Sequence, residues 1–147
     1  MERKERRPVL KFLKLHKDAI LPAYVYEDDA AFGLSSIESF QLKPREVRAV
    51  PTGLAAEIPA GWFVSFRGRG SVSSLGVDVL AGVIDAGYRG EWKVVLANVG
   101  RKPYKVQKGE RIAQGILQPA PQAKIIRVDK LSETKRGGKG FGSTGRK

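Results

Sequence analysis

Residues 82–91, which read Gly-Val-Ile-Asp-Ala-Gly-Tyr-Arg-Gly-Glu, place an acid between an apolar run and a glycine-flanked aromatic ring. A carboxylate at the end of a buried strand is costly to desolvate unless it is used or paired, so Asp85 is a candidate general base. Tyr88 is a candidate platform for a flat ring or a sugar. A turn-capping aspartate and a surface tyrosine are the alternative interpretation, and this stretch alone leaves it open.

Two other stretches carry groups that bind phosphate. Residues 67–73 read Arg-Gly-Arg-Gly-Ser-Val-Ser and combine guanidinium groups, glycines and hydroxyls. Residues 136–145 are rich in glycine, which exposes backbone amides, and they include Arg136, Lys139 and Phe141. This segment is suited to close over a phosphorylated, ring-bearing ligand, although a floppy tail would have the same composition.

Short strands separated by turn residues are predicted to position these stretches. Apolar and β-branched runs recur at intervals of roughly ten residues, with proline and glycine between them. This spacing is typical of an all-β sandwich or barrel, and helical periodicity is confined to a single turn at 72–75. We expect a hairpin formed by 80–84 and 91–96. Further strands are expected at 9–15, 40–42, 46–50, 54–58, 62–66, 104–106, 111–117 and 124–128.

Length and composition indicate one domain. A chain of 147 residues can bury a sizeable core without disulfides, and this one has no cysteine, which also excludes thiolate zinc sites. We expect a β-barrel domain over 1–130, with a basic lead at 1–8, and a flexible C-terminal arm over 131–147. No apolar run is long enough for a membrane span, so we expect a soluble, cytoplasmic protein without membrane partners.

The charge balance leaves a second class of function open. Lys and Arg outnumber Asp and Glu by 27 to 15, and the resulting field attracts nucleic acids as well as free phosphates. Arg-Gly-rich nucleic-acid-binding tails repeat their unit many times and interleave several aromatics, whereas the tail here has only Phe141. The sequence therefore predicts at most weak, non-specific binding to nucleic acid.

Taken together, these stretches resemble the homotrimeric dUTP diphosphatase (dUTPase) family over nearly the whole chain, in the order of its five motifs. Residues 82–90, 109–114 and 136–145 match the third, fourth and fifth motifs, which are specific. Residues 69–73 match the second motif more loosely, since Arg-Gly-Ser-Val-Ser stands where the family commonly has Arg-Ser-Gly-Leu-Ala. Which hydroxyl meets the phosphates is therefore open.

The first motif departs most from the family. Residues 30–34 read Ala-Ala-Phe-Gly-Leu where the family usually has Ala-Gly-Tyr-Asp-Leu, so Gly33 replaces an aspartate. In the family that carboxylate helps the environment of the magnesium-bound triphosphate. Asp28 or Asp29, in the acidic loop that leads into this motif, could supply it instead. Lys139 also replaces a usual glycine in the fifth motif.

The resemblance implies a jelly-roll-like distorted β-barrel, assembled as a trimer with active sites at subunit interfaces. It implies hydrolysis of dUTP to dUMP and pyrophosphate, which limits uracil incorporation into DNA and supplies dUMP. Asp85 would activate a water for in-line attack on the α-phosphorus, and Gln114 would help to hold water or phosphate. Mg²⁺ would be held chiefly by the triphosphate and water.

The resemblance also assigns substrate contacts. The second motif would grip the phosphate chain, and Arg136 would meet its far end. Phe141 would stack on uracil, while Tyr88 would lie under the deoxyribose and leave no room for a 2′-hydroxyl. The full set of expected substrate-binding residues is Arg69, Gly70, Ser71, Val83, Ile84, Asp85, Tyr88, Arg136, Phe141 and Gly142.

Deamination is a related alternative, because dCTP deaminases share this fold and have a similar serine-containing loop and hairpin. Aligning residues 87–90 with the deaminase turn puts Val95 where that family carries its catalytic glutamate. Valine can neither take nor give a proton, so the sequence favours hydrolysis.

Overall fold

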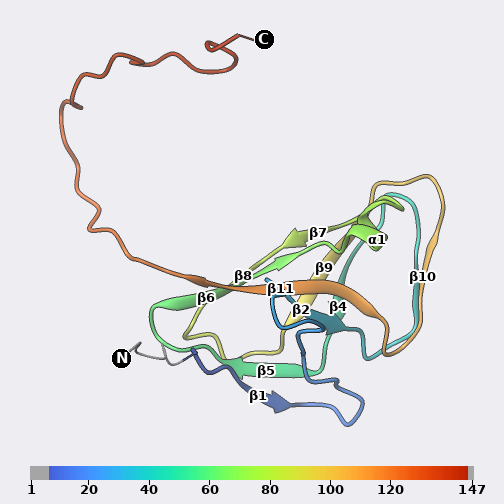
Figure 1. Cartoon of the computed structure of the whole chain (residues 1–147). Helices are drawn as coiled ribbons and strands as arrows, with labels where there is room; N and C mark the ends of the chain where they lie inside the picture. The colour runs from blue at the N-terminus through green and yellow to red at the C-terminus, as the bar shows by residue number, and fades with distance from the viewer. Residues whose placement is uncertain (1–6, 146–147) are drawn as a thin grey trace.

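The computed structural model describes residues 7–145 and confirms the prediction of an all-β protein (Figure 1). Most of the predicted basic lead, together with residues 146–147, lies outside the described residues. The strands are β1 (Lys11–Lys14), β2 (Phe32–Ser35), β3 (Phe40–Leu42), β4 (Val47–Pro51), β5 (Leu54–Glu57), β6 (Trp62–Arg67), β7 (Val77–Ala81), β8 (Val83–Ile84), β9 (Lys93–Asn98), β10 (Tyr104–Val106) and β11 (Arg111–Pro119). One short helix, α1 (Gly70–Ser73), begins two residues earlier than the predicted helical turn and shares residues 72 and 73 with it.

The strands form two larger antiparallel sheets and two small ones. The four-stranded sheet has the order β2-β11-β6-β8, and the three-stranded sheet has the order β4-β9-β7. The pairs β1-β5 and β10-β3 complete the body. The longest strand, β11, runs through the middle of the molecule and is hydrogen-bonded to β2 on one edge and β6 on the other (Figure 1). It therefore joins the first, second and fourth sequence motifs.

An aromatic cluster around Trp92 fills part of the core. The Trp92 side chain is fully buried, and the rings of Phe12 and Phe66 meet it edge-on at centroid distances of 5.1 and 5.4 Å. Phe32 stacks on it at 6.5 Å. A Cβ at Gly115 would collide with the Phe32 ring, so this glycine permits the close approach of β2 to β11.

The expected hairpin between 80–84 and 91–96 is correct only for its first part: Ala81 pairs with Val95, whereas Val83 and Ile84 pair with β6. The predicted strand is interrupted at Gly82, which separates β7 from β8. β7 pairs with β9, whereas β8 pairs with β6 and places Ile84 opposite Val64. A strand has only two edges for hydrogen bonding, and those of β9 are occupied by β4 and β7, so β8 must pair elsewhere.

The strand expected at 124–128 is also absent from the described chain. After Pro119 the polypeptide leaves the body as an extended arm with exposed side chains (Figure 1). Ile125 is 93% exposed and Ile126 is 66% exposed. Alternating apolar residues favour a strand, but a strand also needs a partner edge, and this segment has none within residues 7–145. No helix in that range has the length and hydropathy needed to cross a membrane.

Candidate active site

The loop after β6 places a guanidinium group beside β11. Arg69 has an extended backbone conformation as the residue before α1, and buried Val72 anchors the short helix to the core. The Arg69 Nη1 donates to the backbone oxygen of Arg111 at 3.0 Å. This bond holds the second motif against the fourth.

A second bond joins the same two motifs. The Nε2 of Gln114, on β11, donates to the backbone oxygen of Gly68 at 2.9 Å. Gln114 lies between Gly33 on β2 and Arg67 on β6, and it is half-buried. The side-chain NH₂ of Gln114 therefore attaches the loop that carries Arg69 to β11. The side-chain carbonyl oxygen of Gln114 remains available to a ligand or water.

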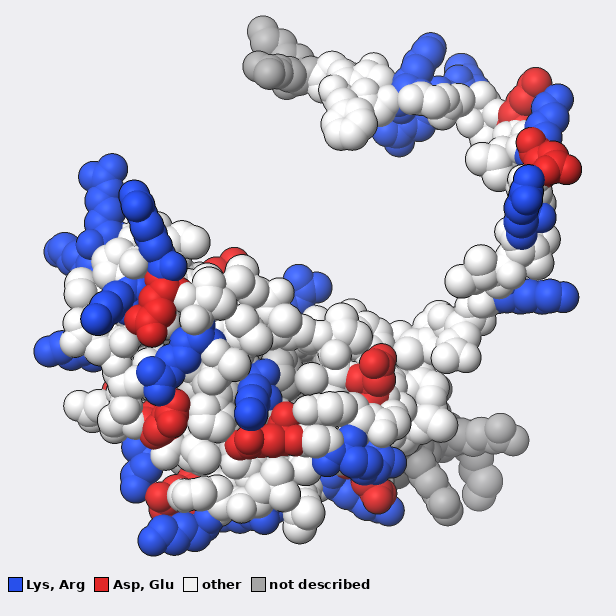
Figure 2. All heavy atoms as spheres, turned by 180° about the vertical axis from the view of Figure 1, so that it is seen from behind, with Lys and Arg blue, Asp and Glu red and all other residues white. Residues whose placement is uncertain are grey.

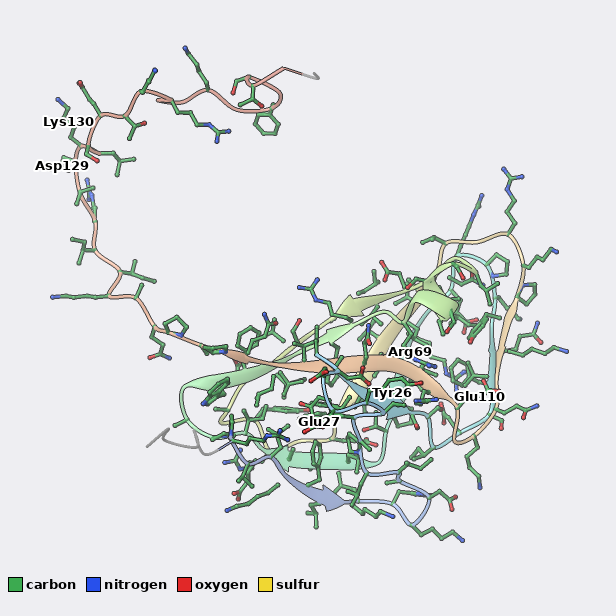
Figure 3. All side chains as sticks on the ribbon, in the orientation of Figure 1. Tyr26, Glu27, Arg69, Glu110, Asp129 and Lys130 are labelled. Carbon is green, nitrogen blue, oxygen red and sulfur yellow. The ribbon has the colours of Figure 1, made fainter. Side chains whose placement is uncertain are left out.

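Two adjoining cavities, with empty volumes of about 900 and 730 Å³ that include space open to solvent, share Arg69 and Arg111 in their walls. Gly33, Gln114 and Asp29 line the larger of the two, together with residues of the segment before β2. Figure 3 shows Tyr26, from that segment, and Arg69 within the body, with Glu110 just before the start of β11. The structure thus brings together the second motif, the fourth motif and the position of the missing aspartate.

Of the two hydroxyls of the second motif, Ser71 is the one that lines the smaller cavity. Ser71 lines this cavity with Arg69, whereas Ser73 lies against Gly68, where a Cβ would collide with its Oγ. Tyr104 also lines it, and burial raises the pKa of this phenol, helped by Glu110 and opposed by Arg69. The Tyr104 hydroxyl therefore stays protonated at neutral pH and can donate to an anion.

The stretch at 82–91 forms a separate, self-contained turn. The Tyr88 N–H donates to the Asp85 backbone oxygen at 3.1 Å, and the Tyr88 hydroxyl donates to the Glu91 backbone oxygen at 3.0 Å. The adjacent Trp92 anchors this turn in the core. Asp85 itself is exposed, so the expectation of a carboxylate at the end of a buried strand is wrong for one chain, because β8 is an edge strand.

Asp85 and Tyr88 line neither of the two cavities. β8 runs antiparallel to β6 with Ile84 opposite Val64, so Asp85 lies toward the start of β6, whereas Arg69 follows its end. The rise of an extended strand makes the separation from Phe63 to Arg67 alone roughly 13 Å. The base candidate Asp85 and Arg69 thus lie near opposite ends of β6.

The expected arm residues also lie apart from the cavities. Arg136, Phe141 and Gly142 are exposed on the extended segment, and Figure 3 shows Asp129 and Lys130 of the same segment far from Arg69. The Arg136 Nε donates to the Lys139 backbone oxygen at 2.9 Å, which forms a local turn. The arm makes contacts within itself and leaves Phe141 fully exposed.

The donor set fits a metal bound mainly through a ligand. Within residues 7–145, no three His, Cys, Asp or Glu side chains are grouped to hold a metal ion. Of the two candidate aspartates, Asp29 lines the larger cavity, and its Oδ2 accepts the Tyr26 N–H at 2.9 Å. Asp28 is exposed and lines neither cavity. Mg²⁺ commonly keeps several waters and binds through phosphates with few protein ligands, which this arrangement permits.

Sequence reasoning gave no role to two residues of this region. Arg111 and Tyr104 line the cavities, although only the motif around Arg111 was recognisable beforehand. Arg111 reaches the cavities because β11 pairs with β2. That pairing cannot be recognised from the residues around Arg111 alone. Val95, the position relevant to deamination, lies on β9 with β4 and β7 on either side.

An all-β body brings two guanidinium groups, a carboxamide and a hydroxyl to adjoining cavities, and such donors suit an anion. The chain belongs to the dUTPase family, whose model matches residues 17–145. It is 46% identical over 140 residues to the deoxyuridine 5′-triphosphate nucleotidohydrolase of Nautilia profundicola, covering 93% of this chain and 99% of the relative. It is 43% identical over 139 residues to that of Gloeothece citriformis, covering 92% and 96%.

Solved structures confirm the jelly-roll-like fold. The dUTPase of Staphylococcus bacteriophage 80alpha with dUpNHpp superposes with a TM-score of 0.88 at 29% identity, covering 93% of this chain and 98% of the phage chain. The recognition of the family from its third, fourth and fifth motifs is thereby confirmed.

Proposed function

We propose that this protein hydrolyses dUTP to dUMP and pyrophosphate. The observation that carries the proposal is the convergence of Arg69, Arg111 and Gln114 on adjoining cavities, in a chain of the dUTPase family. Relatives that share more than two-fifths of their residues with this chain are deoxyuridine 5′-triphosphate nucleotidohydrolases. The dUTPase of bacteriophage 80alpha was solved with dUpNHpp.

The active form is a homotrimer in which different copies complete one site. Asp85 lies too far along β6 to reach the cavities of its own chain, so a second copy supplies the base. Exposed apolar side chains support such an assembly: Val47 is 58%, Leu80 59% and Val83 65% exposed in the single chain. Ile125 and its neighbours offer a strand-like segment that a second copy can pair with.

The residues divide the chemistry between them. Asp85 accepts a proton from a water as the water oxygen attacks the α-phosphorus in line with the bond to the bridging oxygen. That bond breaks, and its electron pair leaves with pyrophosphate. Arg69 and Ser71 hold the phosphate chain, with the exposed amides around Gly70 beside them, while Gln114 orients water or phosphate.

Mg²⁺ bound to the triphosphate neutralises part of its charge when present. The protein contributes Asp29 at the edge of the larger cavity, where its carboxylate can accept from metal-bound water. Asp28 is the less suitable of the two candidates because it does not line the cavity.

Nucleotide selection comes from Tyr88 and the arm. Tyr88, held by its bond to Glu91, packs under the deoxyribose and excludes a 2′-hydroxyl. Val83 and Ile84 contribute the backbone and apolar surface next to it. The arm folds over the bound nucleotide, so that Phe141 stacks on uracil with Gly142 beside it and Arg136 meets the terminal phosphate.

The rival functions lack comparable support. Deamination needs a proton-transfer group at position 95, where this chain has valine. For nucleic acid, Figure 2 shows Lys and Arg side chains gathered at the end of the body away from the arm, with Asp and Glu interspersed over the rest of this face. A surface that carries charges of both signs favours at most weak, salt-sensitive binding to nucleic acid. Removal of dUTP from the DNA precursor pool and supply of dUMP suit a cytoplasmic enzyme.

The test is product analysis with purified protein, Mg²⁺ and one nucleotide at a time. dUTP should give dUMP and pyrophosphate in equal amounts, and UTP, dTTP and dCTP should react at least about 100-fold less efficiently, the scale of discrimination by a shaped pocket. Release of ammonia from dCTP, or absence of dUTP turnover by a folded trimer, would refute the proposal.

A further inference from the structure

The side chain of Arg111 occupies the space that an aspartate at position 33 would need. A Cβ built on Gly33 would lie 2.7 Å from Cδ and 3.3 Å from Cγ of Arg111. These distances are shorter than ordinary carbon contacts, so any side chain at 33 would push the Arg111 stem aside. Gly33 thus lets the Arg111 stem lie flat across β2 at the wall of the larger cavity.

The change at position 33 also alters the charge of the cavity. Arg69 and Arg111 line both cavities, and neither forms an ion pair with a carboxylate among residues 7–145. The carboxylates in the walls are Asp29, which accepts the Tyr26 N–H, and Glu110 in the smaller cavity. Each cavity thus has two guanidinium groups and one carboxylate in its wall, and the positions of the two guanidinium groups are linked by the bond from Arg69 to the Arg111 backbone.

We propose that Arg111 is a phosphate-binding residue in this chain, and that it makes nucleotide binding less dependent on Mg²⁺ than an aspartate at position 33 would allow. The inference rests on the proposed function, because it takes the nucleotide triphosphate as the ligand of these cavities. Arg111 and Arg69 together neutralise phosphate charge directly. A carboxylate at 33 would instead favour the metal-bound triphosphate and attract the Arg111 guanidinium to itself.

The missing carboxylate at position 33 could be compensated for by Asp29 or by Arg111, and the two cases differ in their metal dependence. If Asp29 replaced the carboxylate, nucleotide binding would still require Mg²⁺, and removal of Arg111 would change that requirement little. If Arg111 takes over, the largest loss on its removal appears when Mg²⁺ is absent, because Arg69 is then the one remaining guanidinium group of these cavities that shares the phosphate charge.

The test is the affinity for dUpNHpp measured by calorimetry, with Mg²⁺ and with EDTA, for the wild type, Arg111→Gln and Arg111→Lys. Charge-assisted hydrogen bonds contribute enough that Arg111→Gln should weaken binding about 10- to 100-fold in EDTA and about 3-fold or less with Mg²⁺. Arg111→Lys should recover much of the loss in EDTA. Inorganic tripolyphosphate, used as a second probe, should lose affinity in parallel, which assigns the effect to the phosphate chain.

Variants at position 33, on the neighbouring strand β2, also test whether Arg111 binds phosphate. Gly33→Ala displaces the stem without adding charge and should weaken binding in EDTA by about 3- to 10-fold. Gly33→Asp also adds a carboxylate, and it should weaken binding in EDTA further while increasing the gain on adding Mg²⁺. Arg101→Gln, which removes an exposed arginine outside both cavities, is the charge-matched control and should leave both affinities unchanged.

Thermal denaturation and the oligomeric state of each variant show whether it is folded. If Arg111→Gln does not fold, Arg111→Lys is used to test the role of the guanidinium group. Equal affinities of the wild type and folded Arg111→Gln would overturn the inference. An equal loss with and without Mg²⁺ would overturn it too, because it would show no link to the metal. Both results can coexist with full dUTP turnover by the wild type, so failure here is distinct from failure of the proposed function.

Discussion

The side-chain amide of Gln114 donates to the backbone oxygen of Gly68 at 2.9 Å, across the two neighbouring strands β11 and β6. This bond fixes the loop that carries Arg69 before any ligand arrives. Gly68 is half-buried, so loss of the donor leaves its carbonyl oxygen with poorer solvation than in water. Positioning of Arg69 is therefore coupled to the stability of the body.

Gln114→Ala should lower both stability and turnover. The lost bond predicts a decrease of about 1 kcal/mol in the free energy of unfolding. Turnover should fall by about 10-fold or more, because the amide also orients water or phosphate. Denaturant unfolding and steady-state kinetics measure the two effects. Gln118→Ala, on the same strand but lining neither cavity, is the matched control, and equal kinetics for the two variants would contradict the role of Gln114.

Asp85→Asn should abolish most of the turnover while sparing nucleotide affinity. The amide keeps the shape of the turn but cannot accept the proton of the attacking water, so kcat should fall by about 1,000-fold or more. The affinity for dUpNHpp should change by less than about 3-fold. Asp78→Asn removes another exposed carboxylate, on β7, as a control. A turnover number within a few-fold of the wild type would exclude Asp85 as the base.

Mixed trimers test whether Asp85 acts on a neighbouring copy. Arg69→Gln and Asp85→Asn should each be nearly inactive alone, since each lacks one part of every site. When unfolded and refolded together, they should regain activity, because some interfaces combine an intact Arg69 with an intact Asp85 from different chains. Recovery to about a quarter of the wild-type rate is the order expected from random assembly with one interface per site. Absence of recovery in trimers verified to be mixed would place both residues in the same chain's site.

Gly90→Ala should relax the discrimination against UTP. A Cβ at Gly90 would lie 2.5 Å from the Tyr88 hydroxyl oxygen and 2.7 Å from Cζ, so the ring must move. The kcat/KM ratio of dUTP to UTP should fall by about 10-fold or more, because the displaced ring no longer excludes the 2′-hydroxyl. Gly87→Ala, where a Cβ meets nothing within 4 Å, is the control within the same turn. An unchanged ratio for Gly90→Ala would remove Tyr88 from nucleotide selection.

Most strands of the body were predictable because each carries its own local signal. The runs at 40–42 and 104–106 coincide with β3 and β10, and they are flanked by proline, glycine or charged turns. The wrong pairing of Val83 and Ile84 has a different origin. Which edge a strand occupies depends on every other strand of the sheet, and that information is not local to the sequence.

The same limit applies to the candidate site. Asp85, Arg69 and Gln114 could be named from motifs, but the contact between Gly33 and Arg111 follows from the register of β2 with β11. The segment 124–128 has the composition of a strand and no partner edge in its own chain. Its apolar pattern is explained if the partner belongs to another copy, which a single sequence does not reveal.

The arm should be required for catalysis although it lies away from the cavities in the single chain. Phe141 is the large apolar side chain of the glycine-rich segment, and its full exposure means that it adds no packing to the body. Base–aromatic stacking contributes about 1–3 kcal/mol, so Phe141→Ala should raise KM for dUTP by roughly 5- to 150-fold. The free energy of unfolding should not change.

Phe141→Trp keeps a stacking surface, should retain most activity, and provides a fluorescent reporter that is quenched when dUpNHpp binds. Leu131→Ala, at another exposed apolar side chain of the same segment, controls for general loss of hydrophobic surface. Normal KM in Phe141→Ala together with an unquenched tryptophan would show that the arm does not close over the base.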